Sequence, residues 1–386
     1  MMGYLGGRTL VRSLFLIAIL IVPVASCSRG VTDATPVKAA SGNRAFNDVG
    51  RFLAGLPAVA GSGYAELEKT EAWRNYSTGF NTAWQAAEVK RIQPVRAFQE
   101  RELGGASAKS DFVFYPFSGP DVLYMQGFYP NGSVYVLAGL ERPGAILEPA
   151  AFKPDTLENQ LEGVRRGSAS LFDRSFFVTG EMSRQLRGQL VDGVLPVILM
   201  LLARTGNTID NVRNVGIDDT GKLVELAQAQ GKPGDQPDGL EIIYHKDGEK
   251  KTRKVYYFRL DLGPGLDKNP SFLTFLEPFG KPQTLIKSAS FLLHWKTFIT
   301  LRDYIVSNST QIVQDDTGIR YDVFLKEGWK VRLYGSYGHP DKPFQSQYQV
   351  KLRDAFEEPG RVKPLGFSMG YGIGRRPSHV IVADRP

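Results

Sequence analysis

Cysteine and histidine are scarce in this 386-residue sequence, which contains one cysteine and four histidines. The single cysteine, Cys27, cannot form a disulfide within the chain, so a domain of this size must be stabilised by its hydrophobic core. The histidines include no pair at the spacing of a helical zinc site. We therefore predict neither a bound metal nor a cofactor.

Long hydrophobic runs and a strong excess of one charge are also missing. The main apolar runs, 14–24 and 194–203, are about half the length of roughly 20 residues that a membrane-spanning helix needs. The 47 basic and 40 acidic residues give a net charge of only +7, without the clustered lysines and arginines of nucleic-acid-binding proteins. We therefore expect no nucleic-acid partner.

What the sequence does contain begins with an N-terminal targeting pattern. Arg8 and Arg12 precede the apolar run 14–24, and two small residues, Ala25 and Ser26, follow it. This order of positive charge, apolar core and small residues is typical of a secretory signal. The pattern predicts export, with an ordinary signal peptide and a chance cysteine as the simpler alternative.

The segment Val-Ala-Ser-Cys at 24–27 resembles the lipobox of bacterial lipoproteins, and this resemblance covers only the first 27 residues. It implies diacylation of the Cys27 thiol, cleavage before Cys27 and acylation of the new amine. Several acyl chains would anchor the protein to a membrane without a helix. In a Gram-negative cell, Ser28 after the cysteine resembles the signal for outer-membrane sorting. We therefore expect a lipid-anchored protein of the cell envelope, at the outer membrane and facing the periplasm.

The pattern divides the chain into three parts. Residues 1–26 are the predicted lipoprotein signal peptide, and the small polar residues 27–43 read as a flexible tether. Residues 44–386 are predicted to form a globular domain, and a split into subdomains near 205–240 stays open.

Helical and strand patterns occur in blocks, which favours an α+β fold with a helical N-terminal part followed by antiparallel sheet, hairpins and packed helices. The expected helices cover 44–103, 155–190, 194–203 and 288–306. The expected strands are 111–117 and 379–383, together with the hairpins 122–129/134–140, 240–245/254–262 and 319–325/329–334.

Ser118 and Asp121 are the first candidate site, in a Pro-Phe-Ser-Gly-Pro-Asp turn between two aromatic segments. A serine nucleophile needs a base and an orienting acid. His294 could supply the base, but Ser118 lacks a G-x-S-x-G elbow. An ordinary turn is the structural alternative. His294 itself falls on the apolar stripe of the predicted helix 288–306, so a core histidine is its alternative.

Asp315 and Asp316 are the second candidate site, just before a predicted strand. Adjacent carboxylates can bind a cation or transfer a proton, but the EF-hand spacing is absent and a turn is the alternative. Arg375 and Arg376 end a glycine-rich segment, 366–376, that could bind an anion or simply pack on the core.

Two functions remain in competition. The first is a binding or structural envelope domain whose partners are the membrane, through the lipid, and an unknown envelope protein or small ligand. The second is an envelope hydrolase with a site near Ser118/Asp121, His294 and Asp315/Asp316. The Ser-Gly-Pro-Asp turn and the segments 288–295 and 314–318 loosely resemble uncharacterised bacterial exported proteins, which implies no particular activity.

Overall fold

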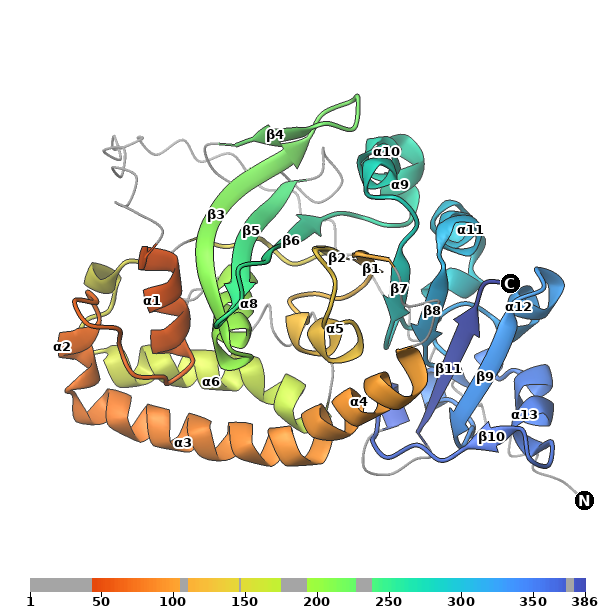
Figure 1. Cartoon of the computed structure of the whole chain (residues 1–386), viewed down its shortest axis with the longest axis horizontal. Helices are drawn as coiled ribbons and strands as arrows, with labels where there is room; N and C mark the ends of the chain where they lie inside the picture. The colour runs from red at the N-terminus through yellow and green to blue at the C-terminus, as the bar shows by residue number, and fades with distance from the viewer. Residues whose placement is uncertain (1–43, 105–109, 146, 175–192, 227–237, 373–377) are drawn as a thin grey trace, which may run out of the picture. The chain divides into compact units, whose positions relative to one another are not determined.

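The computed structural model describes residues 44–104, 110–145, 147–174, 193–226, 238–372 and 378–386 (Figure 1). Its strands form one mixed sheet of eleven strands. In spatial order they are β10 (Val362–Lys363), β9 (Lys330–Gly335), β11 (His379–Asp384), β8 (Gln311–Gln314), β7 (Gln283–Ile286), β1 (Phe112–Tyr115), β2 (Val134–Gly139), β6 (Thr252–Arg259), β5 (Asp238–Lys246), β3 (Asn207–Ile217) and β4 (Leu223–Glu225).

The centre of the sheet is parallel, and antiparallel pairs flank it on both sides. Strands β8, β7, β1, β2 and β6 pair in parallel with their neighbours. On one side β6, β5, β3 and β4 pair antiparallel, with β3 between β5 and β4. On the other side β11 runs antiparallel between β8 and β9, and β10 pairs in parallel with β9. The α+β class is therefore confirmed, with five parallel strands inside a sheet that we expected to be antiparallel.

The burial of the central strands agrees with their parallel pairing. Every residue of β1, β7 and β8 is buried, which is typical of strands covered by helices on both faces. Alternate residues of β1 enter different cores: Val113 and Tyr115 face one, whereas Phe112 and Phe114 face the other. The sheet is thus the middle layer of three.

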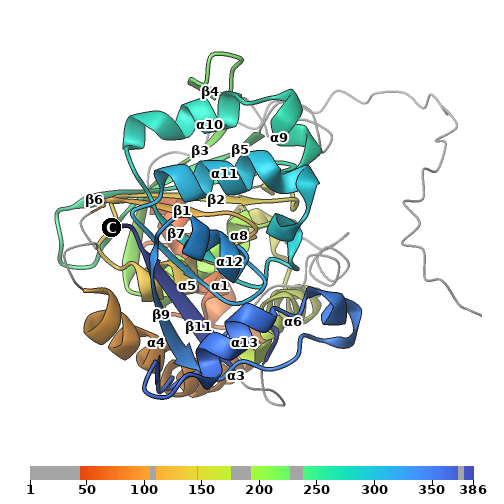
Figure 2. The same cartoon turned by 90° about the vertical axis from the view of Figure 1, so that its right-hand side faces the viewer.

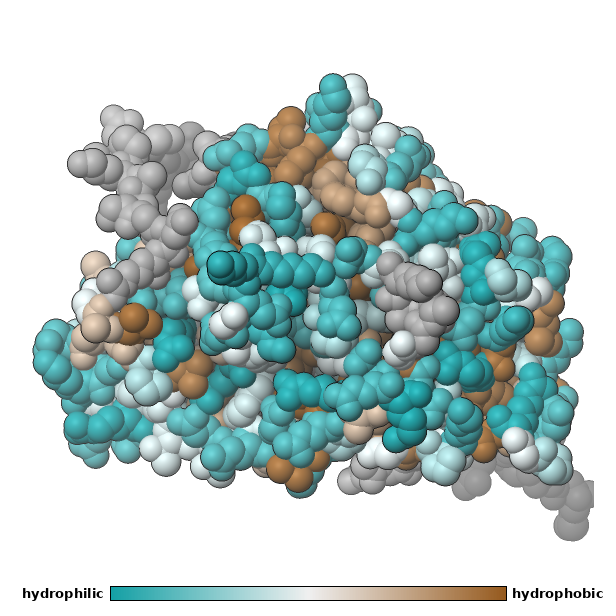
Figure 3. Space-filling view, viewed as in Figure 1, coloured by the Kyte–Doolittle hydropathy of each residue, from teal (hydrophilic) through white to brown (hydrophobic). Residues whose placement is uncertain are grey.

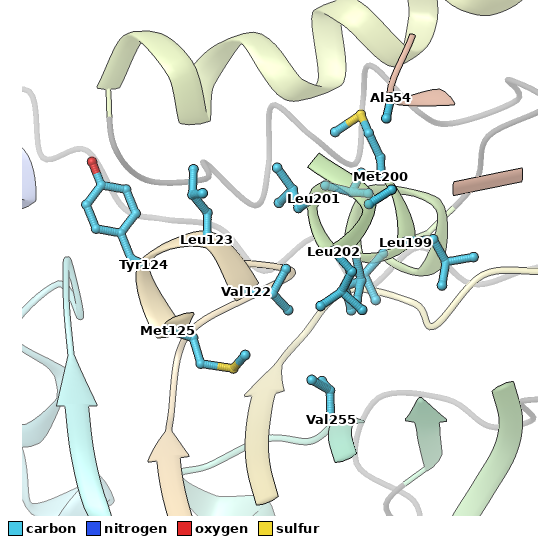
Figure 4. Close-up of a cluster of buried hydrophobic side chains, with 14 of the residues drawn as sticks. Ala54, Val122, Leu123, Tyr124, Met125, Leu199, Met200, Leu201, Leu202 and Val255 are labelled. Carbon is cyan, nitrogen blue, oxygen red and sulfur yellow. The ribbon is translucent and has the colours of Figure 1, made fainter. Parts of the chain in front are cut away.

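One helix group covers each face of the sheet (Figures 1 and 2). The first comprises α1 (Arg44–Leu53), α2 (Ala65–Glu68), α3 (Glu71–Ala87), α4 (Gln93–Phe98), α5 (Val122–Phe128), α6 (Leu157–Arg174) and α8 (Leu195–Arg204). The second comprises α9 (Pro264–Lys268), α10 (Ser271–Leu276), α11 (Ile299–Asn308), α12 (Tyr321–Lys326) and α13 (Val350–Glu357). In the first core, apolar side chains of α5 and α8 lie side by side, as Figure 4 shows for Leu123 and Leu201.

Several local predictions are confirmed. The strands expected at 111–117 and 379–383 are β1 and β11, and the helix expected at 194–203 is α8. The hairpin expected at 240–245/254–262 is β5–β6. Helices α1 to α4 occupy 44–103, with π-helical turns on both sides of α4. Helix α6 covers the described part of 155–190, and 175–190 lies outside the described residues.

Three local predictions are wrong. Residues 122–129 are not a strand, because the Asp121 side chain accepts a hydrogen bond from the Tyr124 N–H and caps α5. Residues 319–325 are not a strand either, since 321–326 form helix α12. The helix expected from 288 starts only at Ile299, because three residues between 288 and 291 have positive φ angles that an α-helix does not allow.

The described surface gives no structural sign of a membrane-spanning segment. No helix among the described residues is both long and apolar enough to cross a bilayer. On the face drawn in Figure 3, hydrophobic residues appear as small patches within a largely hydrophilic surface. Most hydrophobic residues of the described chain therefore lie in the two cores.

Candidate functional site at the carboxyl ends of the parallel strands

Polar and charged residues gather where the parallel strands end. Ser118 and Asp121 follow β1, Lys287 follows β7, and Asp315 and Asp316 follow β8. The chain leaves β1 to form β2 on one side and later returns to form β7 on the other, so this edge contains the topological switch point of the sheet. In open α/β sheets, ligands bind in the crevice beyond the carboxyl ends at such a point.

A buried ion pair closes the β1–β7 half of this edge. The Lys287 ammonium donates to Asp121 Oδ2 at 2.5 Å, and the Tyr115 hydroxyl donates to the same oxygen at 2.9 Å. The ammonium also lies 3.7 Å from the centre of the Tyr124 ring. Burial lowers the pKa of Lys287, while Asp121 and Asp315 favour its charged form. Both side chains of the pair are only 1% exposed, so they do not face a ligand.

The turn after β1 is also filled by the chain itself. Ser118 donates its N–H to the Ala138 carbonyl at 3.0 Å and its hydroxyl to the Gly119 carbonyl at 3.0 Å. Beyond β2, the buried Glu141 carboxylate lies so close that a side chain on Gly139 would collide with it. Many doubly wound proteins hold a phosphate at this turn. Carboxylates line it here, which disfavours an anion.

The other half of the edge, beyond β8, β9 and β11, contains a cleft. It encloses about 470 Å³ of space that is partly open to solvent. Three carboxylates, two imidazoles and an aromatic wall line the cleft, so its described lining carries acidic groups but no lysine or arginine.

Asp315 forms the rigid base of the cleft. Its Oδ2 accepts the Ser288 N–H at 3.0 Å, and its Oδ1 accepts the N–H and the hydroxyl of Thr317 at 3.0 and 2.5 Å. Gly370, with φ at +74°, approaches so closely that a Cβ there would collide with the carboxylate. Burial raises the pKa of Asp315, and the charge of Asp316 raises it further, against the lowering effect of these hydrogen bonds.

Asp316 and His379 form the polar part of the cleft wall. The Asp316 N–H donates to His379 Nε2 at 3.0 Å, so that nitrogen is an acceptor and the ring is neutral. His379 Nδ1 is buried without a hydrogen-bond partner. The Asp316 side chain is 11% exposed, and its Oδ1 lies 3.5 Å from His379 Nε2. No lysine or arginine of the described residues forms an ion pair with this carboxylate.

An aromatic wall stands beside these groups. Phe344 packs against Phe291 with ring centres 5.1 Å apart and stacks on Tyr371 at 5.9 Å. The Tyr371 hydroxyl bonds to Ser290 Oγ at 2.6 Å and donates to the Ser288 carbonyl at 2.8 Å. Burial raises the pKa of Tyr371 to about 12, so this hydroxyl stays protonated at neutral pH. The wall is thus fixed to the loop after β7.

Backbone strain is concentrated at the same edge. The non-glycine residues with positive φ among those described are Phe117, Ser288, Ser290 and Phe291. All four lie just beyond β1 or β7. Such conformations cost about 1–3 kcal/mol each and persist where the surrounding structure enforces them, often near functional sites. The strain marks this edge as the part of the sheet under the strongest conformational constraint.

The candidate catalytic set is not assembled. His294 bonds through Nδ1 to Gln347 Oε1 at 3.0 Å, and its Nε2 is buried without a partner. Burial lowers the pKa of His294. No hydrogen bond among the described residues joins His294 to Ser118 or Asp121, so a Ser–His–Asp triad does not form. Cys27, Arg375 and Arg376 lie outside the described residues.

Of the predicted candidates, Asp315 and Asp316 line the cleft, whereas Ser118 and Asp121 belong to the closed half. Sequence reasoning missed His379 and Tyr371 as cleft residues. Their only sequence signals are their places at the start of the last strand and beside the glycine-rich segment. Within the described residues, no group of three or more His, Cys, Asp or Glu side chains is arranged to hold a metal ion.

Comparisons with protein-family models, curated proteins and solved structures give no match. The functional assignment therefore depends on the geometry of the edge alone.

Proposed function

We propose that this chain is a lipid-anchored cell-envelope protein whose α+β domain binds a small ligand in the cleft beyond β8, β9 and β11. The observation that supports binding is the Asp316 carboxylate, which is nearly buried at the cleft wall and has no lysine or arginine partner within the part of the chain that the structure describes. An ionised carboxylate that is removed from water is costly unless it is paired. A ligand with hydrogen-bond donors would provide that pairing.

Two further features support a binding role. The cleft lies at the edge where open α/β sheets bind their ligands, and its base, Asp315, is held by three hydrogen bonds. The strained turn at 288–291 anchors the aromatic wall to that base. A rigid, preformed arrangement lowers the entropy that a ligand must lose on binding.

The binding role is tested on protein purified in its lipidated form from its own membrane. Bound small molecules are extracted and quantified by mass spectrometry for the wild type, the double variant Asp316→Asn/Phe344→Ala, and the control Asp303→Asn. Asp303 is exposed and lies outside the cleft. We expect at least one compound to be tenfold or more depleted in the double variant only. Identical profiles for all three proteins would refute the proposal.

The anchor is tested separately with Cys27→Ala. We expect this variant to lose incorporation of labelled fatty acid and to appear in the soluble periplasmic fraction. Unchanged membrane retention would contradict the lipid anchor while leaving the cleft untouched.

A hydrolase is the second candidate, supported by the adjacent acids in the cleft. Burial and the neighbouring Asp316 raise the pKa of Asp315, and a carboxyl group with a raised pKa beside a second acid is typical of acid–base catalysis. This candidate predicts that a panel of fluorogenic glycosides and esters contains a substrate whose turnover Asp315→Asn reduces by 10²-fold or more. Turnover that is equal in both proteins would eliminate Asp315 as the acid.

A further inference from the structure

We infer that the ligand of this cleft is an organic cation, a protonated amine or a quaternary ammonium group placed between Asp316 and the aromatic wall. This inference rests on the proposed binding function and specifies the chemical class of the ligand. It follows from the charge of the cleft, from its aromatic surface and from the few oxygen atoms that the cleft offers to a metal ion.

The charge of the cleft favours a cation. Its described lining contains carboxylates and neutral groups, without a lysine or an arginine. His379 does not compensate Asp316, because its Nε2 accepts the Asp316 N–H and therefore carries no proton. The closed half of the same edge shows the alternative solution, in which Lys287 neutralises Asp121. An anionic ligand would be repelled, and a neutral ligand would leave the Asp316 charge uncompensated.

The aromatic wall adds a second recognition element. The rings of Phe344 and Tyr371 lie within 15° of parallel, and Phe291 packs beside Phe344. The faces of aromatic rings attract cations, by about 0.5–2 kcal/mol for each contact according to its exposure. Carboxylate and aromatic faces together are therefore complementary to an alkylated ammonium group rather than to a hydroxyl group.

The oxygen atoms that line the cleft disfavour a metal cation. Calcium takes six to eight oxygen ligands. Both oxygens of Asp315 already accept hydrogen bonds from Ser288 and Thr317, and no described backbone N–H, lysine or arginine donates to the Asp316 carboxylate. Three carboxylates line the cleft, but among the described residues no three acidic, histidine or cysteine side chains are grouped to hold a metal ion. Carboxylates spread along a cleft beside a ring surface fit a large, weakly hydrated organic cation better than a small hydrated ion.

The test compares choline with its neutral isostere, 3,3-dimethylbutan-1-ol, by isothermal titration calorimetry on the full-length protein. We expect choline to bind at least tenfold more tightly than the alcohol. Asp316→Asn should remove this preference by weakening choline binding tenfold or more, and Phe344→Ala should weaken it several-fold. The exposed Asp303→Asn should leave both affinities unchanged. Thermal unfolding of each variant checks that it is folded.

Other outcomes would overturn the inference in distinguishable ways. Equal or tighter binding of the alcohol would show that the cleft binds ligands but does not select a cation. Choline binding that appears only in Arg375→Gln/Arg376→Gln would show that the chain neutralises the cleft itself. If neither probe binds, the cationic class is wrong, and the extraction experiment above decides the binding function independently.

Discussion

The two halves of the carboxyl edge use buried aspartates in opposite ways. Asp121, after β1, receives a lysine ammonium, a tyrosine hydroxyl and a backbone N–H. Asp316, after β8, borders a cleft, and among the described residues the ion-pair contact of its carboxylate is with His379, whose Nε2 accepts the Asp316 N–H. The first aspartate is satisfied by the fold, whereas the carboxylate of the second receives no lysine, arginine or backbone N–H from the described residues.

This difference in pairing predicts a difference in how each charge affects stability. A fully paired, fully buried charge contributes to the integrity of one arrangement, and its loss exposes the remaining partner. An unpaired charge at a cleft lowers stability and is retained where a ligand needs it. Substitutions in the two halves should therefore have opposite effects on stability.

The largest effect is expected from Lys287→Met. Because both partners are 1% exposed, removal of the ammonium leaves Asp121 as an uncompensated buried charge. We expect a loss of about 3–5 kcal/mol in the free energy of unfolding, measured with urea.

Two variants sharpen this measurement. Lys69→Met removes a lysine from an exposed pair with Glu66 and should change stability by at most about 0.5 kcal/mol. Lys287→Met/Asp121→Asn should recover part of the loss, since it removes the stranded charge. A Lys287→Met protein as stable as the Lys69→Met control would contradict the structural role of the closed half.

An intermediate effect is expected at the base of the cleft. Gly370 and Gly360 have almost the same φ, +74° and +75°, but only Gly370 lies against Asp315, and Gly360 has open space around it. Gly360→Ala should cost about 1 kcal/mol through backbone conformation alone. Gly370→Ala should cost about 2–3 kcal/mol, because the new Cβ displaces the Asp315 carboxylate. Equal losses in chemical denaturation would show that Asp315 is not tightly held.

The sequence pattern predicted the structure correctly where a strand or turn depends mainly on its own residues. The Phe-Val-Phe-Tyr run of β1 and the Asp247-Gly248 turn between β5 and β6 form as predicted. The segment 122–129 misled because most of its residues are buried in the first core, so its apolar pattern suited either a strand or a helix. The Asp121 cap decided for the helix.

Only part of the candidate site could be predicted from the sequence. Adjacent acids at 315 and 316 stood out as unusual residues before a predicted strand, and both line the cleft. Their surroundings come from tertiary structure. Lys287 meets Asp121 across 166 positions, and His379 meets Asp316 across 63. No local periodicity encodes such pairs, because strand order in the sheet determines them.

The smallest effect, of opposite sign, is expected from Asp316→Asn. The folded-state pKa of Asp315 is raised above its usual value, first by burial and then by the charge of Asp316. A carboxylate with a raised pKa stabilises the fold least when it is ionised, so its contribution falls as pH increases from about 4 through the folded pKa. Removing the Asp316 charge should reduce that fall.

We therefore expect Asp316→Asn to be about 1 kcal/mol more stable than the wild type in urea unfolding at pH 7. The difference should shrink as the pH falls through the raised folded-state pKa of Asp315, where Asp315 loses its charge. A variant that is less stable at pH 7 would place Asp316 with Asp121 among the structural charges. A variant that is more stable yet unable to bind choline would show that the open half retains an unpaired carboxylate for its ligand, at the expense of stability.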